Sequence, residues 1–190
     1  MKKIILLAFF AIAALSNNAN AQTTNTQSTV KTNASAKLIK VMSVANADTD
    51  GLDFGTIVLT GVGSSTVIME AADASRTYGT NSAAAVNANQ SPNTAKYNVT
   101  GTPNETYALS FPTDPVVLTT ATTATGGNTV SDMTITDFKA RFNGKDADAV
   151  VSILTGSGTD SFAVGGTLNI KADQIPGVYT GTFDVTVDYN

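Results

Sequence analysis

Three carboxylates, Asp48, Asp50 and Asp53, lie close together in the segment DTDGLD. Hard oxygen ligands on a tight turn suit calcium, so this segment is the first place to look for a metal site. Its spacing is not that of an EF-hand, because glycine stands at the fourth position instead of the sixth and no bidentate glutamate follows. We interpret it, like the pair Asp146 and Asp148, as a solvated turn, and we expect neither a metal site nor a cofactor.

Enzyme chemistry has few candidates in this chain. The sequence contains no histidine, cysteine or tryptophan, and the missing histidine removes the commonest general base and metal ligand. The acidic residues show no informative local pattern for paired-carboxylate catalysis. The glycine pairs Gly126-Gly127 and Gly165-Gly166 are not followed by a helix start, so we expect turns or bulges there instead of phosphate loops. We predict that the protein is not an enzyme.

The N-terminus has the features of a secretory signal peptide. Lys2 and Lys3 precede the apolar run 4–15, and Ala19-Asn20-Ala21 forms the small-x-small pattern before a cut ahead of Gln22. This run of twelve residues is too short to cross a bilayer, which takes about 20 in a helix, and no later stretch is as long. We therefore predict a signal peptide at 1–21, no membrane span, and export through the periplasm to the cell surface or the medium.

The charge of the chain narrows its partners. The formal net charge is −4, and it becomes −6 when the two lysines of the predicted signal peptide are removed. A negative balance disfavours binding to nucleic acid or to anionic lipid through bulk charge. A cation or a neutral glycan stays open as a ligand.

Strand signals fill the chain after a polar, threonine-rich leader at 22–35. Runs rich in Thr and Val alternate with turns of Gly, Asn, Asp and Pro, and no segment beyond the signal peptide has a convincing 3.6-residue apolar period. We predict strands at 37–45, 52–59, 65–71, 95–101, 106–112, 116–120, 133–142, 150–155, 161–172 and 178–189, with a long loop over 79–93. This pattern predicts an all-β fold, an antiparallel immunoglobulin-like β-sandwich, as one domain over 36–190 without disulfides.

Alternation within these runs predicts the core. It assigns apolar side chains from Leu38 to Val187 to the interior, among them Ile68, Val151 and Ile153. Burying each large side chain contributes about 1.5 to 3 kcal/mol, which together offsets much of the chain entropy without cross-links.

The last residues, Gly177–Asn190, form the most regular pattern in the chain. Successive side chains of a strand point to opposite faces, so one face is apolar and the other polar. The apolar face carries Tyr179, Gly181, Phe183, Val185, Val187 and Tyr189. We expect a chain that ends on such a strand to place its terminus inside a sheet.

Several motifs resemble known proteins. The block Leu52–Ile57, the hairpin from Tyr97 to Pro112, and Gly165–Leu168 leading into the terminal strand resemble an uncharacterised family of exported bacterial β-sandwich proteins, over about residues 36–190. A glycine at the fourteenth position from the end and an aromatic residue at the second also resemble chaperone-usher pilus subunits, most nearly the archaic, spore-coat-U-like branch.

The second resemblance implies an immunoglobulin-like domain that lacks its last strand. In such pilins a periplasmic chaperone lends a strand to an apolar groove beside the C-terminal strand, and the N-terminal extension of the next subunit replaces it in the fibre. Main-chain hydrogen bonds give affinity and alternate side chains give register. Carried onto this chain, the donor is 22–35 or a later segment with Ala36, Leu38 and Met42. The partner-binding residues are Gly177, Tyr179, Phe183, Val185, Val187 and Tyr189.

Two functions stay open at this point. The first is a non-enzymatic structural subunit of a bacterial surface fibre or pilus, which assembles with like subunits by strand complementation and uses a chaperone and an usher. The second is a self-contained secreted β-sandwich that binds a glycan or a protein through Tyr78, Tyr107 or loop Asp and Asn residues.

Overall fold

The computed structural model describes residues 28–190 except 62, 80–83, 87–90 and 125, and no side chain is described over 81–90. The chain divides into two units, 1–37 and 38–190. The predicted signal peptide and the first part of the predicted leader lie outside the described residues, and 28–37 has no regular secondary structure. No helix that is long and apolar enough to span a membrane occurs among the described residues.

Every regular element of the described residues is a β-strand. The strands are β1 (Ser43–Asn46), β2 (Ile57–Leu59), β3 (Ser65–Met69), β4 (Arg76–Tyr78), β5 (Ala84–Val86), β6 (Ala95–Thr100), β7 (Thr106–Ser110), β8 (Val116–Thr119), β9 (Asp132–Phe142), β10 (Val151–Ile153), β11 (Thr159–Ile170) and β12 (Thr186–Tyr189).

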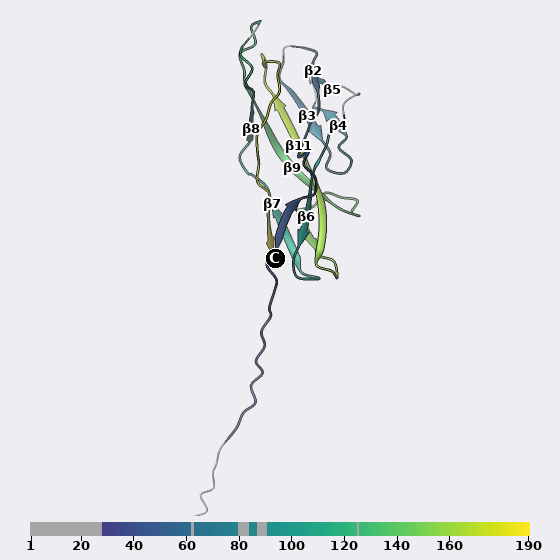
Figure 1. The fold of residues 1–190 in the computed structure, drawn as a ribbon, viewed down its shortest axis with the longest axis vertical. Coiled ribbons are helices and arrows are strands. Elements are labelled where there is room, and N and C mark those ends of the chain that lie inside the picture. Colours follow the sequence, from purple (N-terminus) through teal and green to yellow (C-terminus); the bar gives the residue numbers. More distant parts are fainter. Residues whose placement is uncertain (1–27, 62, 80–83, 87–90, 125) are drawn as a thin grey trace, which may run out of the picture. The chain divides into compact units, whose positions relative to one another are not determined.

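The long strand β11 organises the larger sheet, whose order is β1-β6-β11-β3-β4 (Figure 1). Along one edge β11 pairs first with β6 and then with β3, and along its other edge it pairs with β9, which in turn pairs with β8. The register against β9 shifts between Gly165 and Thr167. A Cβ atom on Gly165 would lie 2.3 Å from the carbonyl oxygen of Met69, so only glycine fits here. This confirms the prediction of a bulge or turn at Gly165-Gly166.

The smaller sheet has the order β10-β7-β12, and β2 pairs with β5 in a separate two-stranded ladder. Each named ladder is antiparallel, and neither of the two larger sheets closes on itself. The structure therefore confirms the predicted all-β antiparallel sandwich.

Two apolar clusters fill the interior. One is centred on Val67, Met69, Ile135, Leu168 and Ile170. The other holds most of the aromatic packing: Phe142 meets the edges of Tyr107 and Phe162 at centroid distances of 5.8 and 5.7 Å.

Some core predictions were wrong. Leu38 is 95% exposed, and Val151 and Ile153 are about half exposed because they lie on the outer face of β10. In β3 the buried side chains are Val67 and Met69, whereas Ile68 is only partly buried. A continuous apolar run such as TVIM does not reveal its phase, because either parity offers apolar side chains to the core.

Several predictions of strands and loops also differ from the structure. The predicted strand 37–45 is β1 at Ser43–Asn46, and the predicted loop 79–93 contains β5 at Ala84–Val86. The predicted strand 178–189 is paired as a ladder only over Thr186–Tyr189, with one isolated bridge between Thr180 and Thr119. The terminal stretch passes from β8 to β7, so no single neighbour follows it along its whole length.

Candidate functional site

The C-terminal stretch presents one apolar face to the interior but buries it only in part. Tyr179, Phe183, Val185, Val187 and Tyr189 are each partly buried, whereas the residues between them are exposed. These five side chains pack at the margins of the two core clusters. The predicted alternation is therefore confirmed, and it leaves apolar area that a further element can cover.

The main chain of β12 is paired on one edge only within the described residues. Asn190 donates its N–H to the carbonyl of Thr106 of β7, at 3.1 Å. N–H groups alternate in direction along an antiparallel strand, so those of Thr186 and Asp188 also point to β7. The N–H groups of Val185 and Val187 therefore point to the unpaired edge.

β1 is the strand nearest to that unpaired edge. Among the described residues it pairs with β6 on one side only, and it contacts β12 (Figure 1). Its partly buried side chain Val44, together with Met42, packs on the same cluster as Val185 and Val187. Two single-sided edges thus lie on either side of a shared apolar margin.

Tyr189, the last residue of β12, forms hydrogen bonds to both neighbouring segments at this end of the apolar margin. Its hydroxyl accepts the N–H of Thr102 at 2.7 Å and donates to the carbonyl of Lys40 at 2.9 Å. A Cβ atom on Gly101 would lie 2.5 Å from the same hydroxyl oxygen, so glycine makes room for the tyrosine. The ring consequently ties the segment before β1 to the β6–β7 turn.

A second tyrosine, Tyr179, anchors the start of the terminal stretch. Its hydroxyl donates to the carbonyl of Ile175 at 2.6 Å and accepts from the side-chain amide of Gln174 at 2.8 Å. Gln174 is buried and also donates to the carbonyls of Val130 and Asp132, each at 3.1 Å. This network satisfies a buried polar side chain and fixes the direction in which the terminal stretch begins.

Two glycines allow the stretch to lie close to β8 and its extension. A Cβ atom on Gly181 would lie 2.6 Å from the carbonyl oxygen of Val117. One on Gly177 would lie 2.7 Å from the hydroxyl of Thr120 and 2.6 Å from that of Thr122. The glycine at the fourteenth position from the end therefore lies directly against the Thr120 and Thr122 side chains, which would have to move to admit a larger residue.

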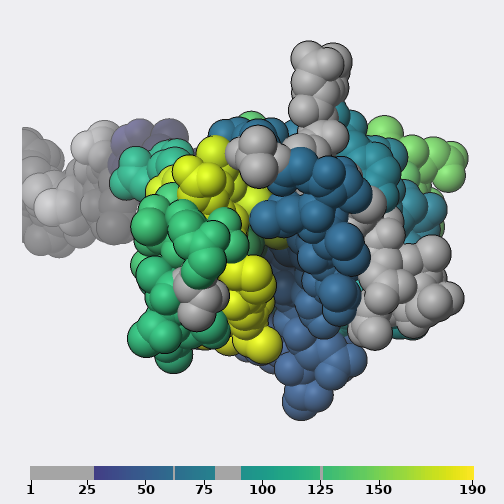
Figure 2. All heavy atoms as spheres, turned by 90° about the horizontal axis from the view of Figure 1, so that it is seen from above, coloured from purple at the N-terminus to yellow at the C-terminus, as the bar shows by residue number. Residues whose placement is uncertain are grey.

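An apolar cleft of about 680 Å³ lies at the other end of the terminal stretch, next to Tyr179. One wall is formed by residues 52–59 and the other by residues 174–179, and Figure 2 shows the hollow between the blue and the yellow segments. The floor comes from the larger sheet, with Met133 of β9 and Leu168 and Ile170 of β11. We call this hollow and the unpaired edge of β12 together the acceptor groove.

The structure brings the predicted partner-binding residues to this groove in two groups. Gly177 and Tyr179 line the cleft itself. Phe183, Val185, Val187 and Tyr189 continue along the second core cluster towards β1. Sequence reasoning missed the opposite wall, although Leu52 and Ile57 lie in the block quoted above for its resemblance to exported β-sandwich proteins.

The acidic turn is engaged in local contacts. The Asp53 carboxylate accepts the N–H of Gly55 at 2.7 Å, which is an Asx turn. Asp48 lies 3.7 Å from the ammonium of Lys96. Across the described part of the chain, no three acidic side chains come together in an arrangement that holds a metal ion.

Of the tyrosines proposed for glycan binding, Tyr107 is fully buried and so does not present a binding surface. Its hydroxyl donates to the Asp160 carboxylate at 2.9 Å, which also accepts from Ser152 at 2.7 Å. Burial, followed by this hydrogen bond, raises the pKa of Tyr107. Tyr78 is 44% exposed and lies on β4, away from the terminal stretch in the strand order.

Comparison with known proteins assigns the domain. The model of the family described as a domain of unknown function, DUF4402, matches residues 43–189. The match begins at the first residue of β1 and ends at the last residue of β12, so it contains every described strand. The chain belongs to this family. None of the curated proteins matches it.

Proposed function

We propose that this protein is a non-enzymatic structural subunit of an exported surface fibre, which assembles when a strand from a neighbouring copy enters the acceptor groove. The observation that carries the proposal is the coincidence of an apolar cleft with an unpaired strand edge along the same C-terminal stretch. An unpaired edge alone invites non-specific pairing, whereas a cleft beside it selects side chains.

The main-chain geometry fits the addition of one strand. The inserted strand would form main-chain hydrogen bonds with the unpaired edge of β12. The N–H groups of Val185 and Val187 point to this edge. Its alternate side chains would cover the partly buried Phe183, Val185 and Val187 on one side and Met42 and Val44 on the other. A bulkier side chain would enter the cleft near Tyr179.

The proposed donor is the N-terminal segment of the next copy, residues 22–35, which is polar and has Val30 as its only large apolar side chain. A later donor would use Ala36 and Leu38 but not Met42, because Met42 packs on the second core cluster of its own subunit. In transit, a periplasmic chaperone would cover the groove and an usher would exchange it for the donor, as the resemblance to archaic pilus subunits implies. This proposal places the protein first in the periplasm and then at the cell surface.

Deletion of the donor tests the proposal. We expect chain 22–190 to form concentration-dependent polymers in light scattering, and chain 36–190 to stay folded without polymerising. Equal polymerisation by both chains would rule out 22–35 as the donor.

Cysteine cross-linking tests where the donor strand binds. The sequence contains no native cysteine, so disulfides can form only between the introduced cysteines. Copies carrying Val30→Cys are mixed with copies carrying Val178→Cys, an 80% exposed residue of the cleft wall. We expect disulfide-linked dimers from this mixture. The matched control is Val151→Cys on the outer face of β10, which is 50% exposed and should cross-link far less. Equal yields from both mixtures would contradict insertion into the groove.

A further inference from the structure

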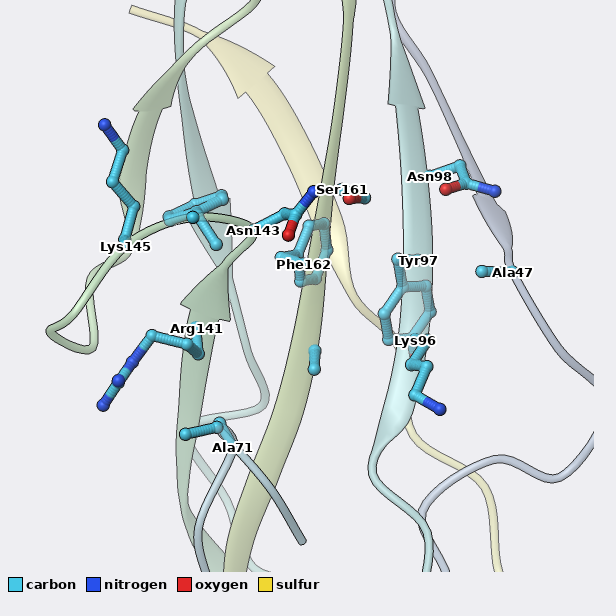
Figure 3. Close-up of a pocket in the computed structure, with 14 residues that line it drawn as sticks. Ala47, Ala71, Lys96, Tyr97, Asn98, Arg141, Asn143, Lys145, Ser161 and Phe162 are labelled. Atoms are coloured by element: carbon cyan, nitrogen blue, oxygen red, sulfur yellow. The ribbon is translucent and has the colours of Figure 1, made fainter.

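A second hollow, of about 380 Å³, lies on the outer face of the larger sheet, over β9, β11 and β6. Figure 3 shows Arg141, Asn143 and Lys145 on one side of β11, and Lys96 and Asn98 on the other. The side chains of Phe142 and Phe162, which alternate with these residues, are buried in the core. The hollow is therefore separate from the acceptor groove and faces away from the interior.

The strand register arranges the lining side chains in two adjacent rows. In the first row, Ala163 of β11 stands between Arg141 of β9 and Lys96 of β6. Neighbouring strands lie about 4.8 Å apart, so the two cationic residues start about 10 Å apart with only a methyl group between them. They form the two sides of a shallow trough.

The second row is polar and uncharged. Ser161 of β11 is paired with Asn98 of β6, and on its other side its carbonyl accepts the N–H of Asn143 at 2.9 Å. The side chains of Asn98, Asn143 and Ser161 make no hydrogen bond with any other described residue. Two amides and a hydroxyl are thus available side by side, each able both to donate and to accept.

The charge of the hollow is opposite to that of the chain. Its lining contains Lys96, Arg141 and Lys145 and no acidic residue, in a protein of formal net charge −4. Arg141 contacts the Asp148 carboxylate at 2.8 Å and donates to the carbonyl of Asp146 at 3.0 Å, and the remaining N–H donors of its guanidinium are free for a ligand. Asp48 lies 3.7 Å from Lys96, which is a loose ion pair.

Small residues keep the trough open. Ala47, Ala71, Ala72 and Ala163 line it, and the larger rings of Phe142 and Phe162 that also line it are buried. The close approach at Gly165 lets residues 69–71 cross β11 and form the wall at one end.

We infer that this trough binds a single carboxylated sugar residue, such as a hexuronate. The carboxylate would lie among the lining cations Lys96, Arg141 and Lys145, where charge-assisted hydrogen bonds are strongest, and the ring hydroxyls would meet the amides and hydroxyl of the second row. A nucleotide fits less well, because the aromatic rings of the lining are not free to stack on a base: Phe142 and Phe162 are buried, and Tyr97 is stacked on Phe162. The negative charge of the rest of the chain disfavours a long polyanion.

The test compares glucuronate with glucose, which differ at one carbon, by chemical-shift titration of the folded chain. We expect saturable binding of glucuronate that shifts the side-chain amide signals of Asn98 and Asn143, and at least tenfold weaker binding of glucose. Lys145→Glu should weaken glucuronate binding about tenfold and Asn98→Ala severalfold. The matched control Lys139→Glu lies on β9 outside the lining and should leave binding unchanged.

Three results would overturn the inference. The first is no saturable binding of glucuronate by a chain with native melting behaviour. The second is equal affinity for glucose or for inorganic phosphate, because the carboxylate or the sugar ring would then play no part. The third is an equal loss in the Lys139→Glu and Lys145→Glu variants, because the effect would then come from bulk charge.

Discussion

Two regions of this sandwich differ in how completely their strands are paired and their side chains are buried. We call the region around β9 and β11 the closed margin and the region along β1 and β12 the open margin. Around β9 and β11, both edges of β11 are paired and Tyr107, Phe142 and Phe162 are buried at 0, 1 and 3% exposure. Along β1 and β12, each strand is paired on one edge, and the apolar side chains between them are only partly covered. We infer that the buried contacts of the closed margin stabilise the fold, although the apolar side chains of the open margin are only partly covered. We propose that the open margin is a binding surface.

The largest expected effect tests the closed margin. Phe142→Ala removes a ring that is packed on two others and should lower the free energy of unfolding by about 3–5 kcal/mol. Phe183→Ala, in the partly buried terminal stretch, should cost less than half as much in the isolated monomer. Urea unfolding of both variants measures the difference. Equal costs would mean that the two margins are equally complete.

The next effect concerns the contact between the terminal stretch and β8. Gly181→Ala puts a Cβ atom 2.6 Å from the carbonyl oxygen of Val117 and should cost about 1–3 kcal/mol through local displacement. Gly156→Ala is the matched control, since nothing lies within 4 Å of its added Cβ atom. Thermal unfolding should separate the two variants. A neutral Gly181→Ala would show that the stretch is free to move away from β8.

A smaller effect tests the hydrogen bonds of the Tyr189 hydroxyl at the β12 end of the acceptor groove. Tyr189→Phe removes the hydroxyl that bonds Thr102 and Lys40 and should cost about 1–2 kcal/mol. Tyr97→Phe serves as the control, because it keeps the ring stacked on Phe162. Hydrogen exchange at β1 and β12 should rise in the first variant and stay unchanged in the second. Unchanged exchange in both would remove the anchoring role.

The last effect appears only at high pH and comes from Tyr107 in the closed margin. The folded state holds the phenolic proton of Tyr107 more tightly than the unfolded chain, because its pKa is raised above the ordinary 10.0. The stabilisation is complete below that value and is lost as the pH rises above it. We expect the free energy of unfolding to fall above pH 10 by at most about 1.4 kcal/mol per pH unit for this group, and Tyr107→Phe to flatten that slope. An unaltered slope in the Tyr107→Phe variant would show that Tyr107 does not cause this pH dependence.

Predictions from sequence succeeded where a local pattern has one structural solution. Strict alternation over the last residues gave the correct apolar face, and the Gly165-Gly166 pair marked a real bulge. They failed where both parities are apolar, as at Val67 and Ile68. They also failed where a long terminal run changes neighbours, because alternation reports which face is apolar and not which strand lies beside it.

The sequence by itself determined the all-β class, the alternating face of the C-terminal stretch and the scarcity of catalytic side chains, because these depend on composition and on the two-residue period of a strand. Only the tertiary structure decided which edges stay unpaired, that residues 52–59 form the wall opposite 174–179, and that Arg141 and Lys96 stand on either side of Ala163. Those features join residues far apart in the chain, and pairing between distant strands follows from the packing of the whole sandwich.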